Sequence, residues 1–263
     1  TIALIVTLIR LSATRSTMAT SAEDVAEGLP LDRMIPSRAQ IPDDPAPGDY
    51  VVVDVTQFST TVAELFARGV EYVHITEERG DERAFKQAVP EARIGGGSGP
   101  AYEGEPGYDF FNSPSVVQDV DLDGRPTAMT STNGGNAVTD LRLAGDTDVT
   151  VYVGGLTNAE ALARHLADRS EPTHFVAAGS GGKPSPEDVA GALYIARHLH
   201  GGAPTARERA VYREMVVGSK GAAYEQKPAI KRTDLYEYAL DFDSQPVVPR
   251  LDGQKLYNVA DSS

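Results

Sequence analysis

An aspartate followed by a run of hydroxyl side chains is the stretch of this sequence with the clearest chemical capacity. Asp54 follows three valines, and Ser59, Thr60 and Thr61 come shortly after it. A carboxylate can hold a divalent cation or act as a base. Hydroxyl and backbone N–H groups at a helix start can bind a phosphate or another anion. The same residues also suit structural roles, with Ser59 or Thr60 capping a helix and Asp54 capping a turn, so this stretch alone leaves both interpretations open.

Similar small polar turns follow other apolar segments of the chain. Residues 130–135 contain Asn-Gly-Gly, residues 179–188 are rich in Gly and Ser, and residues 109–114 are D-F-F-N-S-P. Glycine lets the backbone approach a ligand closely, while amide, hydroxyl and carboxylate oxygens suit phosphoryl groups and Mg²⁺. Each turn alone also has an ordinary structural explanation, since S-P-E-D at 185–188 is typical of any helix N-terminus. These turns add the following candidate residues: Asp109, Asn112, Ser113, Asn133, Gly134, Ser180, Lys183, Glu187 and Asp188.

The predicted elements would place these turns at one edge of a sheet. From residue 49 onward, apolar β-branched runs alternate with helical patterns, which is typical of βαβ units. Parallel strands carry their carboxyl ends at the same edge, so the turns that follow them should line a single cleft. We therefore predict a three-layer α/β/α fold around a largely parallel or mixed sheet. The expected strands are residues 51–55, 72–76, 126–131, 149–153 and 174–178, with one or two more in 247–257, and the expected helices are residues 60–69, 81–88, 136–144, 158–169, 186–200 and 206–217.

The N-terminal part of the chain does not show this alternation. Residues 1–11 are apolar, but they are interrupted by Arg10, too short to span a membrane, and lack the basic start of a secretory signal. Four prolines in residues 35–49 favour an extended arm. We therefore predict a poorly structured extension over residues 1–45. A truncation near Ile41 should then cost little folding stability.

The remainder of the chain, residues 46–263, is long enough for one large α/β domain or two small ones. We predict one α/β domain and leave open a division into two lobes near residue 145. Because the chain begins on Thr and contains methionines at positions 18 and 34, the first residues are interpreted as sequence upstream of the functional protein. No segment predicts a membrane span, and we expect a cytoplasmic protein. A homo-oligomer is compatible with the sequence.

Acidic residues dominate the charge of the chain. Asp and Glu total 38 against 24 Lys and Arg, which gives a formal net charge of -14. Concentrated salt would screen the resulting self-repulsion, so we expect a salt-adapted protein, with an ordinary acidic cytosolic protein as the alternative. The lack of a basic stripe argues against nucleic acid as a partner. The absence of cysteine excludes disulfides, thiolate metal sites and a cysteine nucleophile.

The ordered set of motifs resembles the magnesium-dependent 2-phosphosulfolactate phosphatases of coenzyme M biosynthesis. That family carries V-D-V-x-R-A-T-S-T, where this chain has V-D-V-T-Q-F-S-T-T at residues 53–61. Its F-D-x-x-N-S-P is similar to residues 108–114, and its T-T-T-N-G-T is similar to residues 130–135. Residues 154–158 and 178–188 are also similar to the family's stretches. The resemblance covers about residues 49–259, and the motifs occur in the expected order.

The chain departs from the family's pattern at two places, and each departure replaces an arginine of the family. Gln57 stands where the first motif has arginine, and Gly97-Ser98 stands where a glycine pair is followed by Glu-Arg. A substrate that joins a phosphate to a sulfonate and a carboxylate favours guanidinium partners. The chain therefore resembles a divergent member. Two other functions remain open for the chain. It could be a phosphatase for a different small anionic phosphoester, or a non-catalytic metal- or metabolite-binding protein of the same fold.

The resemblance implies a Mg²⁺-dependent hydrolysis of 2-phosphosulfolactate to 3-sulfolactate and phosphate. It implies that Asp54 binds the metal or activates water, and that Asn133, Glu187 and Asp188 assist catalysis. The implied metal ligands are Asp54, Asp109 and Glu187. The implied substrate contacts are Ser59, Thr60, Thr61, Asn112, Ser113, Gly134, Ser180 and Lys183.

Overall fold

A nine-stranded mixed sheet is the centre of the computed structural model, which describes residues 29–99, 101–145 and 148–260. The strands are β1 (Met34–Ile35), β2 (Gly48–Val53), β3 (Tyr72–Ile75), β4 (Arg93–Gly95), β5 (Pro126–Met129), β6 (Val149–Gly154), β7 (Thr173–Ala177), β8 (Pro249–Asp252) and β9 (Lys255–Asn258). The helices are α2 (Phe58–Ala67), α3 (Asp81–Ala88), α4 (Gly134–Ala144), α5 (Ala159–Ala167), α6 (Pro186–Gly201), α7 (Ala206–Glu225) and α8 (Ala229–Thr233). Shorter helical segments are η2 (Leu31–Arg33), η3 (Arg38–Gln40), η4 (Val116–Asp119) and the π-helical η5 (Asp234–Ala239).

The sheet consists of two parallel groups joined by an antiparallel hairpin. Its strand order is β1-β7-β2-β6-β8-β9-β3-β5-β4. Strands β1, β7, β2 and β6 run parallel to one another, as do β3, β5 and β4. The hairpin β8–β9 pairs antiparallel with β6 on one side and β3 on the other. Both the mixed sheet and the parallel arrangement around β2 were expected from the sequence.

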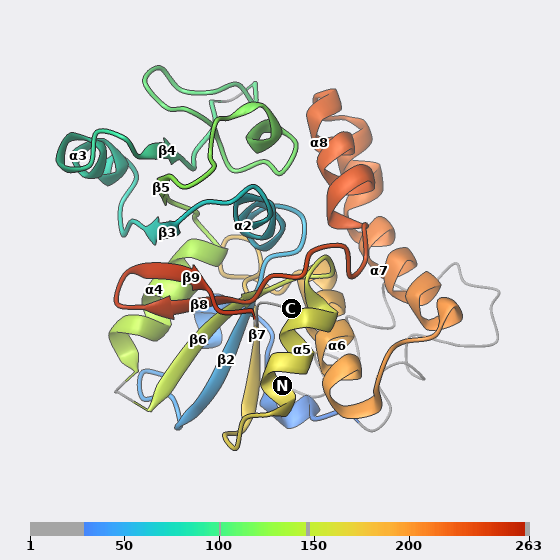
Figure 1. Cartoon of the computed structure of the whole chain (residues 1–263). Coiled ribbons are helices and arrows are strands. Elements are labelled where there is room, and N and C mark those ends of the chain that lie inside the picture. Colours follow the sequence, from blue (N-terminus) through green and yellow to red (C-terminus); the bar gives the residue numbers. More distant parts are fainter. Residues whose placement is uncertain (1–28, 100, 146–147, 261–263) are drawn as a thin grey trace.

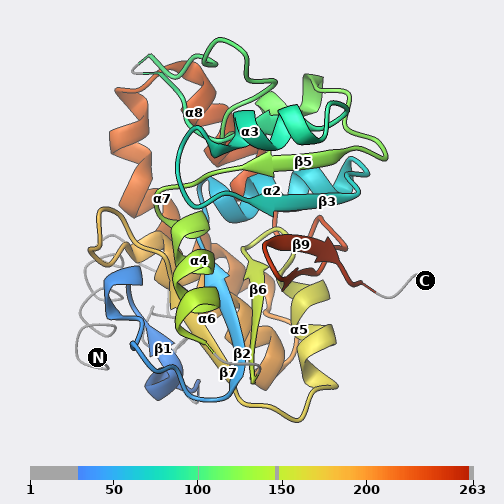
Figure 2. The same ribbon diagram turned by 90° about the vertical axis from the view of Figure 1, so that its left-hand side faces the viewer.

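Helices cover both faces of the sheet, as Figures 1 and 2 show together. Strand β2 is buried along its whole length, and its side chains alternate between two apolar cores. Val51 and Val53 pack in the core that contains residues of α5, α6 and α7. Tyr50 and Val52 pack in the core formed with α2 and α4. The predicted three-layer α/β/α fold is therefore confirmed.

Residues 34–45 do not form the loose extension expected from their prolines. Met34 and Ile35 pair with Phe175 and Val176 of β7, and Met34 is buried. The Arg38 guanidinium forms an ion pair with Asp140 of α4. The folded part therefore begins before residue 46, because this segment supplies an edge strand, and truncation near Ile41 would remove it. The expectation for residues 1–28 concerns sequence outside the described residues.

The strand order also bears on the division into two lobes near residue 145. Strand β2 lies before that position in the chain, yet it pairs with β6 and β7, which lie after it. A cut near residue 145 would therefore separate strands that share one ladder. None of the helices that the structure describes has both the length and the apolar character needed to cross a bilayer.

The C-terminal helices differ most from the sequence expectation. Helix α7 continues to Glu225 rather than ending near residue 217, and α8 and η5 were not expected. Gly218 and several polar residues interrupt the apolar pattern of α7, so periodicity gives no signal for its second half. As Figures 1 and 2 show, α7 and α8 run up along the strands toward the loops that follow β4.

Candidate active site

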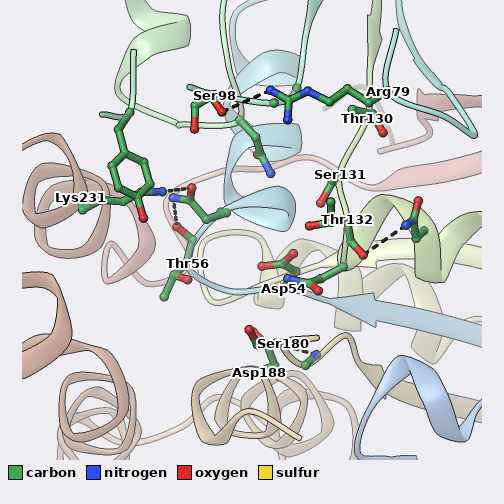
Figure 3. A pocket seen from close by; sticks show the side chains of 18 of the residues that line it. Asp54, Thr56, Arg79, Ser98, Thr130, Ser131, Thr132, Ser180, Asp188 and Lys231 are labelled. Atoms are coloured by element: carbon green, nitrogen blue, oxygen red, sulfur yellow. Dashed lines mark hydrogen bonds between the residues drawn. The ribbon is translucent and has the colours of Figure 1, made fainter. Parts of the chain in front are cut away.

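The carboxyl ends of β2, β5 and β7 open into a cavity of about 460 Å³ (Figure 3). This volume is within the range of about 300–1,000 Å³ that is typical of small-molecule sites. Six of the residues predicted from the sequence line it: Asp54, Asn112, Asn133, Ser180, Glu187 and Asp188. The prediction that turns from separate strands meet in one cleft is therefore confirmed for these residues.

Asp54 and Asp188 hold the ends of three strands together. The Asp54 Oδ2 atom accepts a hydrogen bond of 3.1 Å from the N–H of Gly134, the first residue of α4. The Asp188 carboxylate accepts hydrogen bonds from the N–H groups of Val55 (2.9 Å) and Gly179 (3.0 Å). Asp188 thus links the end of β2 to the end of β7. Figure 3 shows Asp54 near the centre of the cavity and Asp188 below it.

Glu187 is a further carboxylate of the cavity, and a lysine of α7 faces it. The Lys220 Nζ atom lies 2.8 Å from Glu187 Oε1, and Ser219 donates a hydrogen bond to Oε2. Burial alone would lower the pKa of Lys220, but the charge and hydrogen bond of Glu187 raise it. Lys220 therefore stays protonated, and it neutralises part of the negative charge at this end of the cavity.

The cavity concentrates more negative charge than its protein partners neutralise. Burial raises the pKa of Asp54 to about 6, an effect that the Gly134 N–H opposes and the charge of Glu187 reinforces. Burial, followed by the charges of Glu187 and Asp54, raises the pKa of Asp188 well above its ordinary value. A cation placed among these carboxylates would relieve the repulsion.

The donor set fits Mg²⁺ better than it fits a cage-like metal site. Among the described residues, no three or more histidine, cysteine, aspartate or glutamate side chains are arranged to hold a metal ion. Mg²⁺ is usually held by one or two carboxylates, with waters and substrate phosphates completing its shell. Asp54 and Glu187 both line the cavity and interact electrostatically. These two residues suit such a site.

Asp109 is not placed to be a metal ligand, contrary to the prediction. Its Oδ2 atom lies 2.6 Å from Lys86 Nζ and accepts a hydrogen bond from the N–H of Ile94. Asp109 does not line the cavity. Its pairing with Lys86 and the start of β4 gives it a structural role.

Ser59, Thr60 and Thr61 are also structural, and none of them lines the cavity. The Ser59 hydroxyl accepts a hydrogen bond of 2.9 Å from the Asp54 N–H, and the Thr60 hydroxyl donates one of 2.6 Å to the Val55 carbonyl. All three side chains are buried. Ser59 and Thr60 fix the turn between β2 and α2, as the capping interpretation proposed for them. The anion-binding prediction for these residues is therefore wrong.

Three further predicted substrate contacts are engaged with the protein itself. The Ser113 hydroxyl donates to the buried carboxylate of Asp234 at 2.7 Å. Lys183 forms main-chain hydrogen bonds with Ser180 and does not line the cavity. The Gly134 N–H is occupied by Asp54. The Ser113 hydroxyl and the Gly134 N–H therefore already have protein partners, and Lys183 lies outside the cavity lining.

Three basic side chains in the cavity wall were not found from the sequence: Arg79, Lys220 and Lys231. Arg79 lies in the segment between β3 and α3, and Lys220 lies in the part of α7 beyond its expected end. Lys231 belongs to α8, which was not predicted. Single basic residues outside motifs carry no signal of their own. Only the folding of α7 and α8 over the strand ends brings Lys220 and Lys231 here.

We expect Ser59→Ala to weaken folding without affecting the chemistry. Ser59 is 1% exposed, so its replacement leaves the Asp54 N–H without its partner at a cost of about 1–2 kcal/mol. Urea unfolding should show this loss, while kcat/KM for a phosphoester should stay within about threefold. A much larger fall in kcat/KM with unchanged stability would restore the original prediction that Ser59 binds substrate.

Comparisons with known proteins point to a single family. Residues 35–242 match the family described as 2-phosphosulpholactate phosphatase. A probable 2-phosphosulfolactate phosphatase of Deinococcus radiodurans is 34% identical over 160 residues, which are 60% of this chain and 65% of the relative. The corresponding protein of Carboxydothermus hydrogenoformans is 31% identical over 145 residues, covering 55% and 58%. That of Thermus thermophilus is 32% identical over 157 residues, covering 58% and 62%. In each case the match spans less than two thirds of the relative's length.

Proposed function

The chain belongs to the 2-phosphosulfolactate phosphatase family, and from this premise we propose that it hydrolyses 2-phosphosulfolactate to 3-sulfolactate and phosphate. The observation that carries the proposal is the cavity, which gathers four carboxylates and three basic side chains at the strand ends. Phosphoryl transfer depends mainly on positioning and on neutralising charge, and the cavity contains groups for both tasks.

The polar side chains of the cavity that the sequence analysis or the structure singled out have separate roles in this reaction. The side-chain amides of Asn112 and Asn133 hold phosphoryl oxygens, and Ser180 adds a hydroxyl. Asp54 either ligates the metal or accepts a proton from the attacking water, and both roles need its negative charge. Asp188 holds the ends of β2 and β7 in place through its two backbone hydrogen bonds. Lys220 forms an ion pair with Glu187 and neutralises part of its charge.

We propose Mg²⁺ as the cofactor, held by Asp54 and Glu187 together with water and substrate oxygens. When bound, it would neutralise charge on the phosphoryl oxygens. The oxygen-only donor set and the repulsion between the buried carboxylates support this choice. The same proposal includes a place in coenzyme M biosynthesis and a cytoplasmic location.

Phosphate release from 2-phosphosulfolactate tests the proposal. We expect the protein to release phosphate from this ester in the presence of Mg²⁺ and to do so far more slowly from phenyl phosphate. A chelator should lower turnover by at least about a hundredfold, and added Mg²⁺ should restore it, because the charge neutralisation is lost with the metal.

Two other outcomes would separate the competing hypotheses. Fast release from phenyl phosphate or another small phosphoester, with little from 2-phosphosulfolactate, would indicate a phosphatase of different specificity. No release from any phosphoester with Mg²⁺ present would indicate a binding protein. Full activity in the presence of chelator would contradict the assignment of Mg²⁺ but not the proposed phosphatase activity.

A further inference from the structure

Arg79 enters the cavity at the side opposite Asp188, as Figure 3 shows. Its guanidinium donates a hydrogen bond of 3.2 Å to the carbonyl of Ser98 and forms an ion pair with Glu105, which does not line the cavity. Gly97 makes room for it, because a Cβ atom at Gly97 would lie 2.4 Å from Arg79 Cζ. The guanidinium therefore occupies the space that a side chain at position 97 would fill.

Lys231 enters the cavity from α8, and its charge has no carboxylate partner. Its Nζ atom donates to the side-chain oxygen of Gln57 and lies 4.5 Å from the centroid of the Tyr102 ring. Lys231 is 5% exposed, and no carboxylate of the described residues forms an ion pair with it. A buried ammonium without a counter-ion is costly, so the site favours an anion beside it.

The carboxylate of Asp234, which also contacts Gln57, is already engaged by hydrogen bonds. Asp234 accepts hydrogen bonds from Ser113 (2.7 and 2.8 Å) and from Ser115, and a longer one of 3.4 Å from Gln57. Gln57 thus stands between Asp234 and Lys231. Lys220, by contrast, forms an ion pair with Glu187 at the end of the cavity that contains Asp54 and Asp188. The opposite wall of the cavity therefore carries two cations: Lys231, which has no carboxylate partner, and Arg79, whose guanidinium has donors beyond those that Glu105 and Ser98 occupy.

We propose that Arg79 and Lys231 form a second anion subsite, which binds a non-reacting sulfonate or carboxylate of the substrate while its phosphate faces Asp54 and Glu187. The inference rests on the proposed phosphatase function and specifies its substrate class: small phosphoesters that carry at least one further anionic group. It makes Arg79 and Lys231 specificity residues. A guanidinium and an ammonium suit oxyanions because each donates several charged hydrogen bonds.

The protonation of Lys231 agrees with this arrangement. Burial lowers the pKa of Lys231 to about 8, opposed by the negative charges of Asp234 and Asp54 and reinforced by Lys227 and Lys220. The charged and polar groups that face it are Gln57, Tyr102, Asp54, Lys220, Lys227 and Asp234. Above about pH 8 the free protein loses this positive charge. KM for a doubly anionic phosphoester should therefore rise there, and Lys231→Arg should remove the rise.

Matched substitutions test the subsite. Arg79→Gln and Lys231→Gln remove the two cations. Arg83→Gln is the control, because Arg83 donates to a carbonyl of the following loop and does not line the cavity. The substrates are 2-phosphosulfolactate, 2-phospholactate, which lacks the sulfonate, and phenyl phosphate, which lacks both additional anions.

We expect each cavity variant to raise KM for 2-phosphosulfolactate by about tenfold to a hundredfold with kcat within about threefold. The kcat/KM for phenyl phosphate should stay within about threefold, and the Arg83→Gln control should resemble the parent. Gly97→Ala should reproduce the Arg79→Gln pattern more weakly, since it displaces the guanidinium without removing it. Equal losses for all three substrates, or no loss for any, would overturn the subsite.

Binding of 3-sulfolactate separates this inference from the proposed reaction. This molecule carries the sulfonate and carboxylate but no phosphate, so calorimetric titration needs no turnover. If the parent binds it and both cavity variants bind it at least about tenfold more weakly, the subsite stands even when no phosphoester is hydrolysed. If the parent, with its circular dichroism spectrum and melting intact, does not bind 3-sulfolactate, the subsite is rejected whatever the hydrolysis assay shows.

Discussion

Asp54→Asn is expected to lower turnover by at least about a hundredfold and, in the metal-free protein, to raise the stability of the fold by about 1–3 kcal/mol. The first effect follows because both roles proposed for Asp54, metal ligand and base, need a negative charge. The second follows because the carboxylate is buried beside Glu187. An asparagine at this position can still accept the hydrogen bond from Gly134, and it has no charge that Glu187 would repel.

The pH dependence of the stability gain has a definite sign. Burial raises the pKa of Asp54 from 3.8 to about 6, so folding favours the neutral carboxyl group. The favourable contribution is complete below about pH 4 and is lost as the pH rises through about 6. The advantage of Asp54→Asn over the parent should therefore be absent near pH 4 and fully developed above pH 6 to 7.

Urea unfolding at several pH values and phosphate release with Mg²⁺ measure the two effects separately. Asp109→Asn is the control for turnover, because the structure places Asp109 beside Lys86 and outside the cavity. It should keep kcat within about threefold. If Asp54→Asn keeps turnover within a few-fold of the parent, Asp54 has no part in the mechanism and only ties β2 to α4.

Salt should have the second large effect. We expect the thermal midpoint to rise by about 10 °C or more between 0.1 M and 2 M KCl, because a net charge of -14 repels itself across the surface. The Debye length is about 10 Å at 0.1 M salt and about 3 Å at 1 M, so most of this repulsion disappears in molar salt. Mg²⁺ should raise the thermal midpoint further, because it binds only the native state.

A variant with fewer exposed acids provides the control for salt. Asp43, Asp44 and Glu91 are exposed, and their replacement by the corresponding amides changes the net charge from -14 to -11. This variant should melt higher than the parent at 0.1 M KCl and gain less from added salt. A parent whose midpoint is the same at low and molar KCl would show that the acidity is no adaptation to salt.

The sequence predicts the fold and the carboxylate end of the site because both depend on local patterns. The apolar run before Asp54 is a strand buried on both faces, and the S-P-E-D turn begins α6 with Glu187 and Asp188 directed to the cavity. These residues follow strands, so the parallel arrangement brings them together.

Two kinds of residue could not be placed from the sequence. The hydroxyls at 59–61 have the same types and spacing whether they bind an anion or cap a turn, and only their burial decides between the two. Arg79 and Lys231 belong to no motif, and their position depends on tertiary packing. The departures at Gln57 and Gly97 pointed to lost positive charge, whereas the structure brings Lys231 to Gln57 and Arg79 to Gly97.

The hairpin β8–β9 has a consequence for the order of folding. Residues 249–258 follow all the other described strands in the chain, yet they lie in the interior of the sheet between β6 and β3. The two parallel groups can therefore not be joined until this segment has left the ribosome. Contacts between such distant residues close slowly. During synthesis, β6 and β3 present unpaired edges that can associate with other chains. Rapid docking of the β8–β9 hairpin would cover both edges and so protect the nascent protein from such association.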